Sequence, residues 1–181
     1  MTYREAINLG EKVLNMADVA DAKIDAWLLL EMVCKIDRSF YYLHMEDEVA
    51  EEQLSEYEIA LRKRAEHVPL QYIVGEAEFM GLKFKVNSNV LIPRQDTETL
   101  VEEALKHLGD VEKPEILDMC TGSGCILLSL LLERQDACGT GVDVSPEALE
   151  VAKKNAGILK VENRADFVES DLFSAPYFCE K

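Results

Sequence analysis

Apolar residues at helical spacing fill the first part of the chain, up to about residue 67. Residues 21–35, which begin at Asp21 and contain no helix breaker, carry such a set at Ile24, Trp27, Leu28, Leu30 and Val33. Residues 48–66 repeat the spacing at Leu54, Tyr57, Leu61 and Ala65. A period near 3.6 residues predicts amphipathic helices. We therefore expect an all-helical domain over residues 1–73.

The pattern changes after Pro69. Residues 76–79 and 82–86 are short runs separated by Met80-Gly81, and in the second run Phe84 and Val86 alternate with lysines. Alternation on both sides of a short glycine turn predicts a β-hairpin. The extended residues 90–92 then lead into Pro93, which disfavours helix in the residue before it. We interpret residues 74–93 as a hairpin linker.

Residues 94–181 alternate between strand and helix patterns. Strands are predicted at residues 115–119, 139–144 and 165–169, and helices at 125–133 and 145–159. Ser145-Pro146-Glu147 is a strong helix start, with a capping hydroxyl followed by proline. Asp96 or Thr97 can cap an earlier helix, whose apolar face carries Leu100, Val101, Ala104, Leu105 and Leu108. The alternation predicts an α/β fold, with a parallel, doubly wound sheet and helices on its faces.

The net charge of the chain limits the classes of partner that it can bind. Thirty-five acidic residues against 19 basic ones give a net charge of −16. Such a surface repels phosphate backbones and anionic membranes, so we expect no direct nucleic-acid or membrane binding. Residues 46–58 hold seven acids and no base. That run is a solvated helix face or, alternatively, a docking surface for a basic protein.

The cysteines and histidines indicate neither a disulfide framework nor a metal site. Cysteines stand at positions 34, 120, 125, 138 and 179 without a C-x-x-C pair, and the three histidines lack metal-ligand spacing relative to them. There is also no 18-residue apolar stretch and no signal-peptide pattern. We expect a soluble, cytoplasmic protein with reduced thiols and no bound metal.

The most informative segment runs from Ile116 to Gly124, where a predicted strand ends in a small-residue turn and enters a helix. Such turns present backbone N–H groups at the carboxyl edge of a sheet, where open α/β folds bind ligands. Asp143 ends the next strand, where a carboxylate can accept hydrogen bonds from both hydroxyls of a ribose. It could instead cap a helix, although Ser145 already supplies that cap. Asp171 follows the third strand at the same edge, where a base would lie.

The turn lacks the features that bind phosphates. The third glycine of a G-x-G-x-x-G dinucleotide fingerprint is replaced by Leu127, no lysine or arginine stands in the turn, and no phosphate-loop motif is present. A nucleoside without phosphates fits better, and S-adenosylmethionine is the common one.

Several motifs together carry a family resemblance. The run Asp118-Met-Cys-Thr-Gly-Ser-Gly124 resembles the first motif of Rossmann-like methyltransferases. Three more specific motifs, at residues 69–75, 79–81 and 91–98, resemble those of the glutamine methyltransferases that modify peptide-chain release factors. The resemblance covers nearly the whole chain. It implies methyl transfer from S-adenosylmethionine to the glutamine of the Gly-Gly-Gln motif of a class 1 release factor.

The resemblance also assigns residues. It implies that the cofactor is held by Cys120, Thr121, Gly122, Ser123 and Gly124 at the methionine and ribose, Asp143 at the ribose hydroxyls, and Asp171 and Leu172 beside the adenine. Arg94 and Thr97 would line the entrance. Cys120 replaces a usual glycine, and Gln95 a usual proline.

The resemblance implies that the Asn-Pro-Pro-Tyr motif, which holds the substrate amide in the family, lies beyond Lys181, so no catalytic residue is assigned within these 181 residues. We therefore expect a C-terminally truncated methyltransferase domain that is inactive alone. Two alternatives stay open. One is a methyltransferase of the same fold acting on another protein or on a nucleobase amine, and the other is a non-enzymatic helical adaptor.

Overall fold

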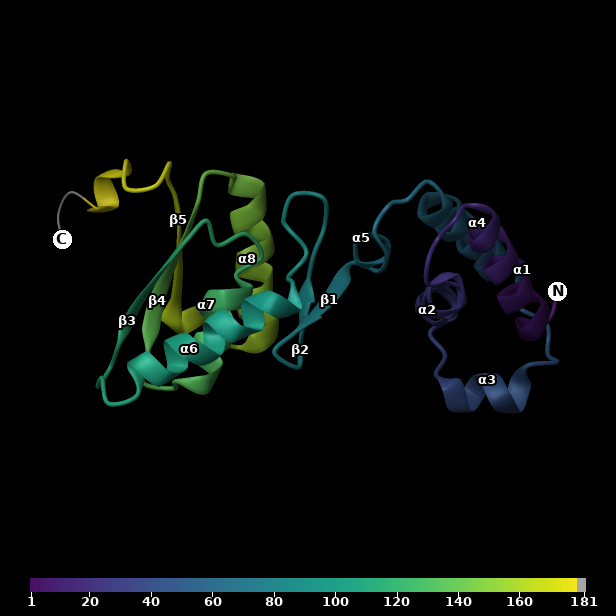
Figure 1. The fold of residues 1–181 in the computed structure, drawn as a ribbon, viewed down its shortest axis with the longest axis horizontal. Helices are drawn as coiled ribbons and strands as arrows, with labels where there is room; N and C mark the ends of the chain where they lie inside the picture. Colours follow the sequence, from purple (N-terminus) through teal and green to yellow (C-terminus); the bar gives the residue numbers. More distant parts are fainter. Residues whose placement is uncertain (179–181) are drawn as a thin grey trace. The chain divides into compact units, whose positions relative to one another are not determined.

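The computed structural model describes residues 1–178 and divides the chain into two compact units, Met1–Val74 and the residues from Gly75 onward (Figure 1). Cys179 lies outside the described residues. The first unit is entirely helical and contains α1 (Tyr3–Met16), α2 (Ala22–Cys34), α3 (Arg38–His44), α4 (Glu51–Ala65) and α5 (Leu70–Val74). The predicted helices at residues 21–35 and 48–66 thus correspond to α2 and α4.

The first unit is built around close contact between α1, α2 and α4. The Tyr57 hydroxyl, fully buried on α4, donates a hydrogen bond to the Ala26 carbonyl of α2 at 3.0 Å. The Arg64 guanidinium pairs with the buried Asp25 carboxylate at 2.6 Å. These contacts join α4 to α2 through polar groups that would be costly to bury unpaired.

One prediction for this unit is wrong. Ile24 was assigned to the buried face of its helix, yet its side chain is 54% exposed. The helix instead buries the small residues Ala22 and Ala26 along with leucines 29 and 30. Gly10 of α1 comes so close to Ala26 that an added Cβ would lie 3.1 Å from the alanine methyl. Because α1 and α2 approach each other so closely, α2 buries the face that carries small side chains.

The hairpin is part of the core of the second unit. Strands β1 (Glu76–Phe79) and β2 (Leu82–Lys85) pair antiparallel, as predicted. Phe79 and Phe84 are fully buried and pack in the same cluster as Val101 and the four leucines 127, 128, 130 and 131. Burying two phenylalanines fixes the hairpin to the domain that follows it.

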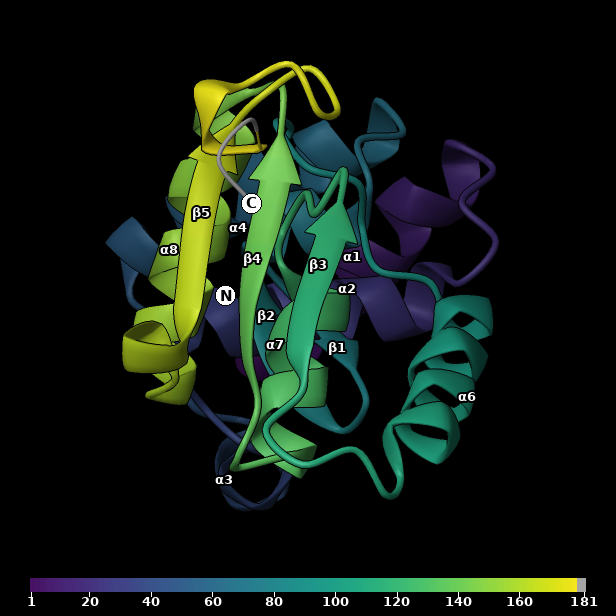
Figure 2. The same ribbon diagram turned by 90° about the vertical axis from the view of Figure 1, so that its left-hand side faces the viewer.

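Three parallel strands form the sheet of the second unit: β3 (Glu115–Met119), β4 (Cys138–Asp143) and β5 (Ala165–Glu169), in the order β3-β4-β5. The helices are α6 (Glu98–Leu108), α7 (Cys125–Glu133) and α8 (Pro146–Leu159). Figure 2 shows α7 and α8 behind the sheet and α6 beside β3. The register pairs Met119 with Val142 and Asp143 with Glu169, so the strand ends lie at one edge. The predicted α/β, Rossmann-like class is confirmed.

Two details of α6 differ from the predictions. Leu100 is 55% exposed, whereas Val101 is fully buried, because α6 contacts mainly α7 and buries a narrower face than the pattern suggested. The Thr97 side chain makes no capping hydrogen bond, since residues Gln95–Thr97 form a 3₁₀ turn that continues directly into the helix. By contrast, the predicted cap of α8 is present: the Ser145 hydroxyl accepts from the Ala148 N–H at 3.1 Å.

Neither a membrane-spanning helix nor a metal site is found in the described part of the chain. Within residues 1–178, every helix is too short or too polar to cross a bilayer. Nor do three or more histidine, cysteine, aspartate or glutamate side chains gather where they could hold a metal ion. Four described cysteines, at positions 34, 120, 125 and 138, are free thiols.

Candidate functional site

The glycine turn between β3 and α7 depends on left-handed backbone conformations. Cys120, Gly122 and Gly124 have φ values of +63°, +54° and +79°. Glycine adopts this region without steric cost, whereas the Cβ of a cysteine makes it unfavourable by about 1 kcal/mol or more. The Gly124 N–H donates to the Thr121 carbonyl at 2.8 Å and so closes the turn where α7 begins.

Asp143, at the end of β4, holds this turn from the neighbouring strand. One of its carboxylate oxygens, Oδ2, accepts from the Gly122 N–H at 2.9 Å, and Oδ1 accepts from the Ser145 N–H at 3.0 Å. A carboxylate offers about four acceptor positions, so each oxygen retains one for a ligand. Asp143 is half-buried. The geometry therefore orders the carboxylate and leaves two acceptor positions for a diol.

Two residues of the turn direct their side chains into the protein. Thr121 and Ser123 are 6% and 2% exposed. The Thr121 hydroxyl donates to the buried Asp118 carboxylate at 2.6 Å. Of the five turn residues predicted to surround the cofactor, these two can therefore offer a ligand only their backbone groups. The thiol-bearing Cys120 is exposed.

Asp118 is a buried acid that the sequence-based assignment missed. Burial raises the pKa of its carboxyl group, and the nearby negative charge of Asp143 acts in the same direction. Hydrogen bonds from the Thr121 hydroxyl and the Leu127 N–H lower the pKa but do not cancel the effect. Its position near the end of β3, directly after Ile116 and Leu117 and just before the turn, was the available signal. Its observed role is to anchor Thr121.

The remaining predicted residues lie in two places. Asp171 and Leu172 are exposed just beyond β5, and the Ser170 N–H donates to the Asp143 carbonyl at 3.0 Å, which ties this segment to the edge that carries Asp143. Arg94 immediately precedes the 3₁₀ turn Gln95–Thr97, and Thr97 ends that turn where α6 begins. Among the described residues, no hydrogen bond or ion pair joins either of them to the glycine turn.

The groups at this edge fit a nucleoside without phosphates. The Asp143 carboxylate suits a ribose diol, and no lysine or arginine stands among residues 118–124, 143–145 or 170–172 to meet a phosphate. Two apolar residues in the segments that follow β4 and β5, Val144 and Leu172, are 68% and 54% exposed. Exposed apolar groups at the edge that carries a carboxylate match a ligand that has a flat base attached to a sugar.

Comparison with known proteins shows what each unit is similar to. Residues 5–75 match the PrmC N-terminal domain and residues 116–181 match a methyltransferase domain. The release factor glutamine methyltransferase of Koribacter versatilis is 38% identical over 175 residues, which cover 97% of this chain and 62% of that protein. The corresponding protein of Leptospira interrogans is 41% identical over 166 residues, covering 91% and 58%.

The chain thus spans about three fifths of the length of these curated relatives. Among solved structures, an RNA methyltransferase from Salinibacter ruber in complex with S-adenosyl-L-homocysteine aligns at 29% identity and a TM-score of 0.39. That alignment covers 48% of this chain and 53% of the other, an overlap too limited to define a ligand here. The family models matched by the two units and the curated relatives agree: over the residues it contains, the chain is similar to release factor glutamine methyltransferases.

Proposed function

We propose that this chain is part of an enzyme that transfers a methyl group from S-adenosylmethionine to the side-chain amide nitrogen of a glutamine. The acceptor is the Gly-Gly-Gln motif of class 1 peptide-chain release factors. The observation that carries the proposal is the glycine turn held by Asp143, in a chain whose curated relatives are named release factor glutamine methyltransferases. The family relation supports the reaction, and the turn supports the nucleoside cofactor.

The residues at the carboxyl edge of the sheet bind and orient the cofactor. Asp143 accepts hydrogen bonds from the ribose hydroxyls with the acceptor positions that Gly122 and Ser145 leave free. The backbone of Cys120–Gly124 follows the ribose and the methionine portion, and Asp171 and Leu172 lie beside the adenine. Because Thr121 and Ser123 are buried, their side chains support the turn and do not contact the cofactor.

The reaction explains why precise positioning matters. The lone pair of an amide nitrogen is delocalised into its carbonyl, so the nitrogen is a weak nucleophile. When bound, S-adenosylmethionine would supply an electrophilic methyl group, whose transfer to nitrogen would leave the electron pair of the C–S bond on sulfur and release the amide proton to water. Residues of this chain contribute by holding the methyl donor in a fixed position. The amide nitrogen can then attack in line with the methyl group from about 3–3.5 Å.

The expected partner is a protein. The net charge of −16 disfavours nucleic acid as the acceptor. In the first unit, acidic residues 46, 47, 48, 51 and 52 lie around the start of α4. They would complement a basic face of a release factor, and a translation factor as substrate implies a cytoplasmic location.

A methyl-transfer assay tests this function. The protein that contains these residues, with whatever sequence accompanies them in its gene, is incubated with methyl-labelled S-adenosylmethionine and a purified class 1 release factor. We expect label on the glutamine of Gly-Gly-Gln, located by peptide mass spectrometry, and none on a release factor whose motif glutamine is replaced by alanine. Label on RNA instead would support the nucleobase alternative, and label on no acceptor would favour the adaptor alternative.

A further inference from the structure

A single buried amide on α8 contacts both the glycine turn and the hairpin. Asn155 is fully buried, on the helix face that also carries Val151, Ala152 and Ala156. A buried amide without partners is costly, and this one has three. Its Oδ1 accepts from the Lys85 N–H at 2.7 Å, and its Nδ2 donates to the Lys85 carbonyl at 3.0 Å and to the Ser123 carbonyl at 2.9 Å.

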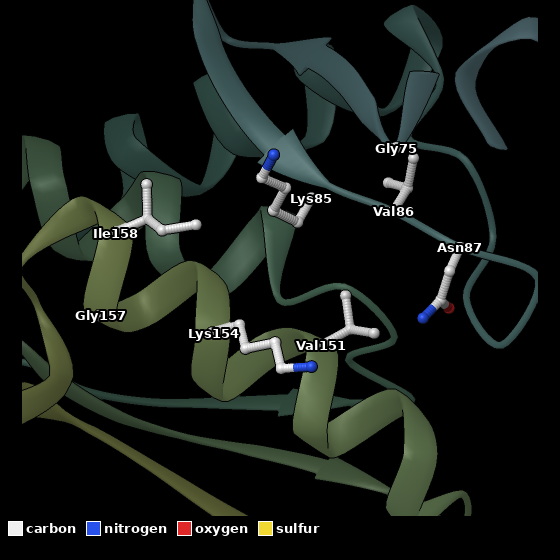
Figure 3. Close-up of a pocket in the computed structure, with 8 residues that line it drawn as sticks. All are labelled: Gly75, Lys85, Val86, Asn87, Val151, Lys154, Gly157 and Ile158. Atoms are coloured by element: carbon white, nitrogen blue, oxygen red, sulfur yellow. The ribbon is translucent and has the colours of Figure 1, made fainter. Parts of the chain in front are cut away.

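The contact with Lys85 is two-sided. The side-chain amide of Asn155 accepts from one backbone group of Lys85 and donates to the other, as a neighbouring strand would. It therefore caps β2 and fixes its position relative to α8. A groove of about 570 Å³ lies between the hairpin and α8. Figure 3 shows Lys85 on the hairpin side of it and Val151 on the α8 side. The buried Asn155 amide does not line this groove, and its two hydrogen bonds to the Lys85 backbone connect the hairpin to α8.

The contact with Ser123 fixes a peptide group of the turn. The carbonyl of the Ser123–Gly124 peptide accepts from Asn155, and its N–H donates to the Thr121 carbonyl at 2.8 Å. Both polar groups of that peptide are thus held. Gly124 also lies close to α8, since an added Cβ would be 3.3 Å from the Ala152 methyl. Asn155 and Asp143 hold successive parts of the turn from two different elements.

We propose that Asn155 is a positioning residue that couples the hairpin to the cofactor turn, so that cofactor affinity depends on the hairpin being in place. This rests on the proposed function, because it assumes that the turn binds S-adenosylmethionine. The physical reason is that one rigid side chain satisfies groups on both segments, which are separated by 38 residues in the sequence. Displacement of either segment leaves buried groups of the other without partners.

The variant Asn155→Asp tests the coupling. A carboxylate can still accept from the Lys85 N–H, but it faces the Ser123 and Lys85 carbonyls without a hydrogen to donate. We expect the affinity for S-adenosylhomocysteine, measured by calorimetry, to fall tenfold or more. Amide hydrogen exchange, followed by NMR, should speed up at Gly124 and Lys85 together and stay unchanged in α1 and α2. The matched control is Asn163→Asp, an exposed asparagine, with no change expected in either measurement.

A second measurement needs no variant. In the unaltered protein, S-adenosylhomocysteine should slow exchange of the Lys85 amide on the hairpin as well as that of Gly124, because coupling between two sites is reciprocal. Unchanged affinity and unchanged Gly124 exchange in folded Asn155→Asp would overturn the proposal, as would ligand protection confined to the turn. If the unaltered protein binds no S-adenosylhomocysteine, the proposed cofactor is wrong. The exchange rates in Asn155→Asp then test the coupling alone: faster exchange at both Gly124 and Lys85 supports it, and unchanged exchange at Gly124 contradicts it.

Discussion

Replacing Asp143 with alanine should weaken cofactor binding strongly. Its two oxygens each accept one backbone hydrogen bond, at 2.9 and 3.0 Å, and each retains one acceptor position for a ribose hydroxyl. Hydrogen bonds to a charged group contribute about 1.5–3 kcal/mol each. Because the carboxylate is half-buried, the lower figure applies, which gives a total of about 3 kcal/mol and a loss of affinity of roughly 100-fold.

Calorimetric titration with S-adenosylhomocysteine measures this loss. The matched control is Asp166→Ala, which removes an exposed acid near the opposite end of β5 and changes the net charge equally. Thermal unfolding of both variants separates a lost ligand contact from a loosened turn, since Asp143 also holds Gly122. Equal affinities in the two variants would refute the assignment of Asp143 to the ribose.

Three further predictions concern other parts of the chain. Gly10→Ala should lower the free energy of unfolding by about 1–2 kcal/mol, because its Cβ would overlap the Tyr57 hydroxyl. Gly157→Ala, with open space around it, should raise that free energy slightly, and urea unfolding compares the two. Alkylation of the exposed Cys120 should be slowed by S-adenosylmethionine, as peptide mapping can show, and protection at buried Cys34 alone would place the ligand elsewhere. The raised pKa of the Asp118 carboxyl adds stability that is fully present below its ordinary pKa of 3.8 and is lost as pH rises through the raised value. Asp118→Asn should lack this contribution, so the stability of the unaltered protein relative to the variant should fall across that window in unfolding measured at a series of pH values.

Local sequence patterns predicted the positions of helices and strands better than which side of each helix is buried. The bounds predicted for β3 and β5 agree with the structure, because in both cases a short strand pattern stands between turn-forming and helical segments of the sequence. The burial of Ile24 and Leu100 was mispredicted, since the buried side of a helix depends on which neighbours it meets. Periodicity alone does not contain that information.

The candidate site likewise contains residues that local patterns predict and contacts that only the structure shows. The place of Asp143 at a strand end follows from local pattern, and the structure shows that its carboxylate reaches the glycine turn. The contacts of Asn155 join residues up to 70 positions apart, so no local pattern could supply them. Its only signal was an amide among apolar residues on the buried face of a predicted helix. The cofactor contacts of Asp171 and Leu172 remain predictions.

An NMR titration of the chain with S-adenosylmethionine tests the central claim most directly. Backbone amide shifts report binding at each residue, without the need for a methyl acceptor. We expect saturable changes concentrated at Gly122, Gly124 and residues 143–145 and 171–172, along the carboxyl edge of the sheet. Changes centred instead on the groove between the hairpin and α8, or no saturable change at the glycine turn, would contradict the proposal that this turn is the cofactor site.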